Sequence, residues 1–294
     1  PATGGSVMTL IAVILALLIN SHLSPGGWRS ARGFNHYADW LRGRLLPLGL
    51  WDHAGGLALL LLPVLMPLGL LQWLAGGWLF GLLGVLLAVG ALLFAFGGGE
   101  TLEAEVAAFT TAWQRGDEAA AQNALDAMAG ASQPVTPLEA MPEAAAGHLV
   151  LRARTRLFAP VFWLLVLGPV GAFGYRIVVL ARAFGACHDN AGPGYCASVE
   201  RLIGLLDWLP DRLMALSLAL AGHFNAAWQA WEYNPGQPVS KRLSETGLGA
   251  LGLPPADSPR DLTAQAVIDA HAMLRRGLYV WLAAIAAGVL LAAA

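Results

Sequence analysis

Charged side chains interrupt an otherwise apolar stretch at residues 200–224, and they are the first candidates for chemistry. Asp207, Asp211 and Arg212 stand there within the sequence LLDWLPDRL. Ionisable groups inside apolar membrane segments face a cavity or one another. Two interpretations follow: a ligand site, or an internal Asp–Arg pair that holds the segment in place.

A second polar set surrounds the apolar stretch at residues 157–184. Arg152 and Arg156 are four residues apart just before it, so they share one face of a helix and could bind a phosphate or a carboxylate. We therefore expect a ligand-binding cavity and assign no catalytic residue. Its expected lining is Arg152, Arg156, Tyr175, Arg176, Asp207, Asp211 and Arg212.

Two cysteines, Cys187 and Cys196, bracket the loop between the two stretches, with His188 and Asp189 beside the first. This spacing matches no standard zinc site, so we expect no metal. A disulfide would need an oxidising compartment, so the side of the membrane decides their redox state. We favour the reduced, cytoplasmic alternative.

The elements that position these residues contain helix breakers. Pro160, Gly168 and Pro169 interrupt the first stretch, and Pro210 interrupts the second. Backbone groups freed by such breaks at membrane depth need partners from protein or a water-filled cavity. The sequence predicts one or two broken helices, which either re-enter on the cytoplasmic side or cross fully.

The composition indicates a membrane protein. Hydrophobic residues make up 57% of the 294, and charged residues only 12%, against roughly 25% in soluble domains. The net charge of −2, with no basic run, argues against a nucleic-acid partner. We predict an all-α polytopic membrane protein with transmembrane spans near residues 9–23, 56–73, 78–96 and 277–294.

Charge placement predicts the topology. All 17 Lys and Arg residues lie in residues 29–44, 115–156 and 176–276, so the positive-inside tendency puts these loops in the cytoplasm. We set residues 1–7 apart as vector-derived, with Met8 as the native start. The expected organisation is a membrane region at 8–98 with an amphipathic loop at 24–55, a cytoplasmic helical loop at 99–156, a Pro-centred broken-helix core at 157–225, a cytoplasmic loop and helix at 226–276, and the last span at 277–294.

The loop at 99–156 carries helical signals. Val106, Phe109 and Trp113 predict one short helix, and a second follows a turn at residues 115–117. The acidic residues before and within the first helix are expected to be solvated: Glu100, Glu103 and Glu105.

Several motifs carry a family resemblance. The run LFAPVFWLLVLGPVGAFGYR, followed by LLDWLPDRL and LALAGHFNAAWQAW, resembles the AmpE family of bacterial inner-membrane proteins, which is linked to β-lactamase regulation. The AmpE family is in turn related to the CobD/CbiB synthases of cobalamin biosynthesis. The resemblance covers nearly the whole chain.

The synthase pattern of acidic residues is missing from this chain. Where the synthases carry acidic residues and Asn before the AP motif, this chain has Gly147, Leu151, Arg152 and Thr155. Later Asn, Thr and Asp positions hold Val179, Leu180 and Arg182, and Ile203 and Gly204 replace paired aspartates. Trp208, Pro210 and Arg212 are kept, with Asp207 in place of Asn.

These departures bear on activity, because activating a carboxylate with a nucleoside triphosphate needs carboxylates to hold Mg²⁺. The resemblance therefore implies a non-enzymatic inner-membrane sensor or signalling modulator, tied to cell-wall recycling and β-lactamase regulation, without a cofactor. The alternative is an ATP-dependent amide-forming synthase acting on a cobalamin precursor. The expected partners are the lipid bilayer, a small anionic ligand, and a membrane or cytoplasmic signalling protein.

Overall fold

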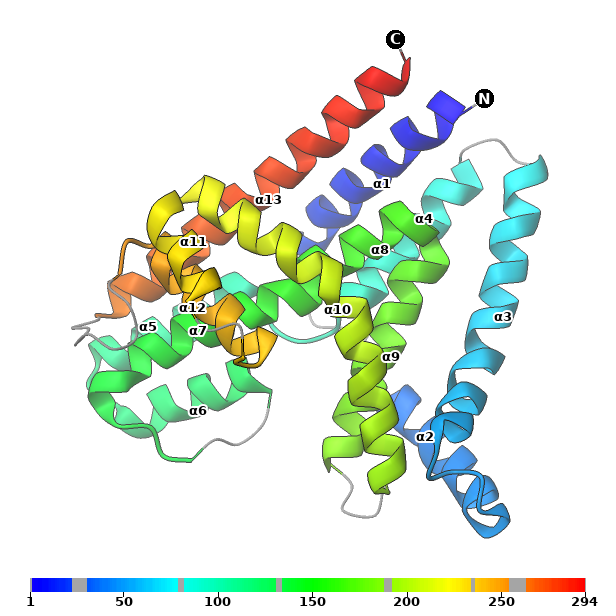
Figure 1. The fold of residues 1–294 in the computed structure, drawn as a ribbon, viewed down its shortest axis with the longest axis horizontal. Helices are drawn as coiled ribbons and strands as arrows, with labels where there is room; N and C mark the ends of the chain where they lie inside the picture. Colours follow the sequence, from blue (N-terminus) through cyan, green and yellow to red (C-terminus); the bar gives the residue numbers. More distant parts are fainter. Residues whose placement is uncertain are drawn as a thin grey trace. The chain divides into compact units, whose positions relative to one another are not determined.

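The described residues form helices joined by turns and short loops, and in the computed structural model they are 2–22, 31–78, 82–130, 134–187, 192–233, 236–253 and 263–293. No strand occurs in these ranges. The helices follow one another along the chain as coloured in Figure 1. They are α1 (Ala2–His22), α2 (Ala31–Leu45), α3 (Ala54–Trp78), α4 (Leu82–Phe96), α5 (Leu102–Gln114), α6 (Glu118–Ala129), α7 (Met141–Ala153), α8 (Ala159–Leu167), α9 (Pro169–Cys187), α10 (Pro193–Ala221), α11 (Phe224–Glu232), α12 (Val239–Ala250) and α13 (Ala264–Ala293).

The chain divides into two compact units. The first unit comprises Pro1–Gly99, Ala159–Leu209 and Ala286–Ala294, and the second comprises Glu100–Phe158 and Pro210–Ile285. Helix α10 belongs to both, because the division falls at Pro210.

Among the described residues, two helices are long and apolar enough to cross a membrane. They are Ala54–Leu74 within α3 and Ala264–Leu291 within α13. The apolar helices at Val7–His22 and Leu82–Phe96 are shorter than a full crossing. The all-helical, membrane-type fold agrees with the sequence, whereas the count of four spans stays a prediction. Helix α1 also begins at Ala2, ahead of the expected span.

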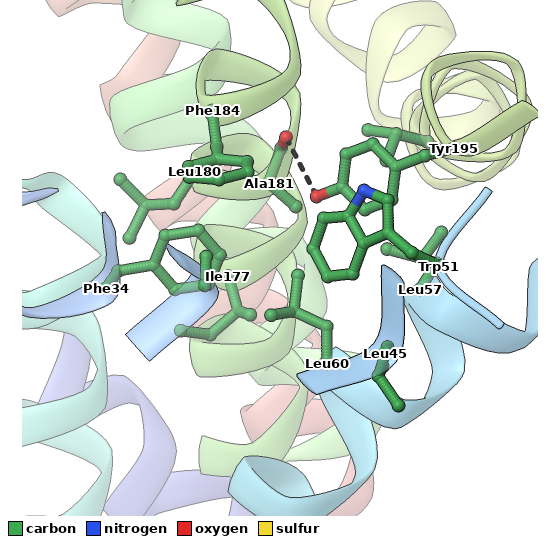
Figure 2. Packing of buried hydrophobic residues seen from close by; sticks show 12 residues of the cluster. Phe34, Leu45, Trp51, Leu57, Leu60, Ile177, Leu180, Ala181, Phe184 and Tyr195 are labelled. Carbon is green, nitrogen blue, oxygen red and sulfur yellow. Dashed lines mark hydrogen bonds between the residues drawn. The ribbon is translucent and has the colours of Figure 1, made fainter. Parts of the chain in front are cut away.

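The first unit has a core between α2, α3 and α9 (Figure 2). Phe34 and Leu45 come from α2, which is the amphipathic helix expected in the 24–55 loop. Trp51 stacks on Tyr195 with ring centroids 4.8 Å apart, and the Tyr195 hydroxyl donates to the Ala181 carbonyl at 3.2 Å. This core ties the α2–α3 connection to the start of α10.

One of the two Pro-containing stretches is broken. Helix α8 ends at Leu167, Gly168 follows with φ +71°, and α9 begins at Pro169. A glycine with positive φ ends a helix without steric cost, and proline is favoured in the first turn of the next helix. By contrast, α10 continues through Pro210, so the second stretch is a single helix as far as Ala221.

The second unit packs α7 against α5, α6 and α12. Its first two helices confirm the sequence reading: Asp117 caps α6 by accepting from the Ala120 N–H at 2.9 Å. Small residues allow α7 and α12 to approach closely, since a Cβ at Gly147 would lie 2.3 Å from Ser244 Oγ.

The start of α10 offers a sharp packing test. A Cβ at Gly194 would lie 2.3 Å from the backbone oxygen of Asp52, whose carboxylate also accepts from the Tyr195 N–H at 2.9 Å. We expect Gly194→Ala to destabilise the protein by about 1–3 kcal/mol through overpacking. The measurement is reversible unfolding in mixed detergent micelles, followed by near-UV circular dichroism.

The matched control is Gly204→Ala in the same helix, where an added Cβ meets nothing within 4 Å. This change should stabilise α10 by about 0.5–1 kcal/mol, because alanine is the better helix former. A Gly194→Ala variant as stable as the wild type, or stabilised like Gly204→Ala, would contradict the close contact at Asp52.

Candidate functional site

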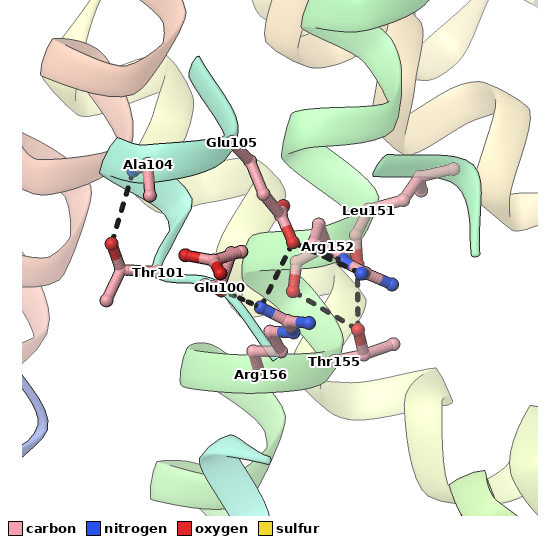
Figure 3. Close-up of polar contacts among 8 residues, drawn as sticks. All are labelled: Glu100, Thr101, Ala104, Glu105, Leu151, Arg152, Thr155 and Arg156. Atoms are coloured by element: carbon pink, nitrogen blue, oxygen red, sulfur yellow. Dashed lines mark hydrogen bonds and ion pairs between the residues drawn. The ribbon is translucent and has the colours of Figure 1, made fainter. Parts of the chain in front are cut away.

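The second unit contains a buried carboxylate, Glu105, that is held by two arginines. Arg152 in α7 approaches Glu105 Oε1 with Nε at 3.3 Å and Nη2 at 3.2 Å, and Arg156 Nη1 lies 3.2 Å from the same oxygen. Figure 3 shows Glu105 pointing between the two guanidinium groups. The arginines do share one face and do hold a carboxylate, but the carboxylate belongs to the chain itself.

The Glu105 carboxylate is only half satisfied. The residue is 6% exposed, and within the described part of the chain Oε2 has no hydrogen-bond donor. The three side chains together carry one net positive charge.

Local structure explains why both arginines reach Glu105. Thr101 caps α5 by accepting from the Ala104 N–H, so Glu105 lies near the start of this helix. Arg152 lies at the end of α7, and Arg156 follows in a π-helical turn, Arg154–Phe158. Arg156 also donates to the Glu100 carbonyl, which fixes the beginning of α5 (Figure 3).

Arg154 makes a separate, more deeply buried pair. Its Nη1 lies 3.2 Å from Asp211 Oδ2, and the two side chains are 7% and 1% exposed. The sequence predicted an Asp–Arg pair as one alternative for Asp211, and a pair is present with Arg154. Arg212, the next residue along, is exposed.

The first unit contains the remaining expected site residues. Tyr175 donates its hydroxyl to Asp207 Oδ1 at 2.8 Å, and Asp207 is 5% exposed. Arg176 lies on the same helix as Tyr175, and its guanidinium approaches Gly97 at the end of α4. Tyr175 and Asp207 are therefore brought together as a buried hydrogen-bonded pair.

Sequence reasoning missed two participants, Glu105 and Arg154. The expectation that Glu105 is solvated was wrong, because its carboxylate is buried against Arg152 and Arg156. A signal existed: Glu105 precedes the buried Phe109 by four residues and so shares its helical face. Arg154 stands between the two arginines already singled out.

One histidine borders the cluster. Burial, and secondarily the charge of Arg152 one turn away, lower the pKa of His148 below its usual value. The neutral imidazole is therefore favoured near neutral pH.

The cysteine prediction falls mainly outside the described residues. His188, Asp189 and the side chain of Cys187 are not described, while Cys196 is a free thiol whose sulfur lies 3.9 Å from the Gly185 carbonyl. Throughout the described ranges, no three His, Cys, Asp or Glu side chains gather as a metal site would require.

The comparisons with known proteins now decide the family. The family model described as "Regulatory signalling modulator protein AmpE" matches residues 8–240. The chain belongs to the AmpE family. No solved structure matches the chain.

Curated relatives come from both branches suggested by the motifs. The chain is similar to Protein AmpE of Shigella flexneri, 33% identical over 25% of this chain and 27% of the relative. It is also similar to the Cobalamin biosynthesis protein CobD of Chromobacterium violaceum, 28% identical over 47% of this chain and 50% of the relative. A CobD of Stutzerimonas stutzeri is 26% identical over 39% of each chain. The matched regions thus span half or less of these relatives.

Proposed function

We propose that this AmpE-family chain is a non-enzymatic signalling modulator of the bacterial inner membrane, linked to cell-wall recycling and β-lactamase regulation. The family match over residues 8–240 supports the regulatory role, and the apolar helices α3 and α13 support a membrane location. In this proposal the chain crosses the membrane several times and keeps its charged loops in the cytoplasm.

The observation that carries the proposal is the ion pair that Arg152 forms with Glu105. In the related synthases this segment is acidic, as a nucleotide-bound Mg²⁺ requires. Here Arg152 binds the Glu105 carboxylate, and nearby Gly147 packs against Ser244. The segment therefore serves ion pairing and helix packing in the second unit, which suits a conformational device better than a nucleotide site.

The Glu105 cluster also indicates where a small anionic ligand would act. A phosphate or carboxylate could bind Arg152 and Arg156 only by competing with Glu105, since both guanidiniums already contact its Oε1. Displacing Glu105 would loosen the start of α5 and change the surface offered to a signalling protein in the membrane or cytoplasm. For the other residues of the predicted cavity, a role in ligand binding stays a prediction.

A synthase remains the second candidate because of the CobD matches. The two CobD relatives align over 47% and 39% of this chain, whereas the curated AmpE aligns over 25%. The corresponding activity would be ATP-dependent amide formation on a cobalamin precursor.

Deleting the gene in its source bacterium separates the two functions. We expect the deletion to change β-lactamase induction by a sub-inhibitory β-lactam and to leave growth without added cobalamin unaffected. Wild-type protein should restore induction, while Glu105→Gln should restore it only partly, because it weakens the link between the arginines and α5.

The matched control is Glu200→Gln. Glu200 forms an ion pair with Arg182, and both side chains are about half exposed. This variant should complement like wild type, since exposed ion pairs contribute little. Normal induction together with a cobalamin requirement in the deletion strain would favour the synthase instead.

A further inference from the structure

The turn between α8 and α9 is capped by a side chain from α3, a helix almost one hundred residues earlier in the chain. Gln72 in α3 donates from Nε2 to the Leu167 carbonyl at 3.1 Å and accepts at Oε1 from the Val170 N–H at 3.0 Å. These are a carbonyl at the end of α8 and an N–H at the start of α9. A single amide thus satisfies backbone groups on both sides of the break, which ordinarily depend on caps or water.

The two helices fold back closely at this turn. A Cβ at Gly171 would lie 2.3 Å from the Trp163 backbone oxygen, so α8 and α9 are in backbone contact one turn beyond the break. Helix α8 continues α7 without a gap through the π-helical turn, but only residues 157–167 of this run follow its last charged residue, Arg156. At 1.5 Å per residue this apolar part is about 17 Å long, too short to cross a hydrocarbon layer of about 30 Å.

The turn nevertheless presents consecutive apolar side chains outward. Leu165, Val166 and Leu167 are 39%, 55% and 52% exposed. On α3 the neighbours of Gln72 are also apolar and exposed, with Leu71 at 41% and Trp73 at 75%. Such a surface is unfavourable in water and suits contact with acyl chains.

Contacts with α4 place the turn along an apolar helix. Phe173 stacks on Phe94 with centroids 4.5 Å apart, and Arg176 lies against Gly97, so α9 and α4 run in the same direction. Continuing this register places Pro169 at the level of Gly90 along the helix axis, near the middle of Leu82–Phe96. Helix α4 is about 22 Å long at 1.5 Å per residue.

We propose that the α8–α9 turn ends inside the hydrocarbon layer as a re-entrant hairpin, with Leu165–Leu167 facing lipid acyl chains and Gln72 replacing water as the backbone cap. A broken helix at membrane depth requires such internal partners. The hairpin then enters and leaves on one side of the membrane. The inference concerns membrane insertion and holds for either candidate function.

A nitroxide spin label at residue 166 tests the lipid contact. The protein would carry Cys187→Ser, Cys196→Ser and Val166→Cys in phosphatidylethanolamine–phosphatidylglycerol nanodiscs. We expect high accessibility to O₂ and low accessibility to a water-soluble nickel chelate. The lipid control is Leu70→Cys on the exposed face of α3, and the water control is Asn123→Cys on α6.

The outcomes at residue 166 distinguish the alternatives. Nickel accessibility equal to that at residue 123 would place the turn in water and overturn the proposal. Low accessibility to both reagents would mean that protein covers the turn, which also overturns it.

Gln72→Met tests the cap while keeping side-chain length. In detergent micelles, where local opening admits water to the turn, backbone deuterium exchange in the peptide containing Val170 should rise at least about tenfold, because the amide loses its acceptor. Unchanged exchange would show that Gln72 is not the cap. Gln72→Asn is the second variant, and it should give a smaller increase because its shorter amide keeps hydrogen-bonding capacity.

Discussion

Replacing Asp211 with alanine should destabilise the second unit by about 3–5 kcal/mol, because it leaves a buried guanidinium without its carboxylate. Asp211 is 1% exposed, and its carboxylate receives Arg154 Nη1 at 3.2 and 3.4 Å. The measurement is the free energy of unfolding in mixed detergent micelles. A destabilisation of this size would rank among the largest for a single substitution.

Two controls distinguish the effect of breaking a buried ion pair from the effect of removing any charged side chain. Glu200→Ala removes a carboxylate from the Arg182 pair, whose side chains are 47% and 53% exposed, and should cost less than about 1 kcal/mol. Arg154→Met combined with Asp211→Leu removes both buried charges and should recover most of the stability lost in Asp211→Ala. An Asp211→Ala variant as stable as Glu200→Ala would contradict the buried pair.

The sequence could predict features that depend on local chemistry. The break at Gly168–Pro169 follows from a positive-φ glycine and a proline in adjacent positions, and the structure confirms it. The Arg115–Asp117 turn separates α5 from α6 as expected, with Asp117 as the cap. The shared face of Arg152 and Arg156 also followed from helical spacing alone.

Pro210 is a position where the local sequence did not predict the structure. The proline removes one backbone hydrogen bond, yet α10 continues across it for a total of 29 residues. Contacts on either side hold the helix: Asp207 accepts from Tyr175, and Asp211 binds Arg154. These contacts join residues more than thirty positions apart, so the local sequence could not reveal them.

The ion-pair partners of Asp211 and Glu105 lie far away along the chain, so the local sequence could not identify them. Adjacent residues on a helix point about 100° apart, so helix geometry does not favour a pair between Asp211 and Arg212. It could not select Arg154, 57 residues earlier, as the partner of Asp211. Likewise, the burial of Glu105 depends on arginines about fifty residues away, so its helical face was predictable and its partners were not.

Replacing Glu105 with alanine is the other change expected to have a large effect. It should destabilise the second unit by about 1.5–3 kcal/mol, the range for hydrogen bonds to charged groups. The loss should be smaller than for Asp211→Ala, because Arg152 and Arg156 are 23% and 14% exposed and water partly screens them. Unfolding in mixed micelles measures it, with Glu103→Ala, an exposed change in the same helix, as the control.

Arg152 and Arg156 contact the same oxygen of Glu105, so single and double substitutions should not have additive effects on stability. Arg152→Ala or Arg156→Ala alone should cost less than Glu105→Ala, because the carboxylate keeps its second guanidinium. In the Glu105→Ala background, removing either arginine should cost little or even stabilise the unit by relieving repulsion between like charges. A double-mutant cycle should therefore give a coupling energy of about 0.5–3 kcal/mol between Glu105 and each arginine. Additive losses would mean that the three side chains act independently, and Glu105 could not then transmit anion binding at Arg152 and Arg156 to α5.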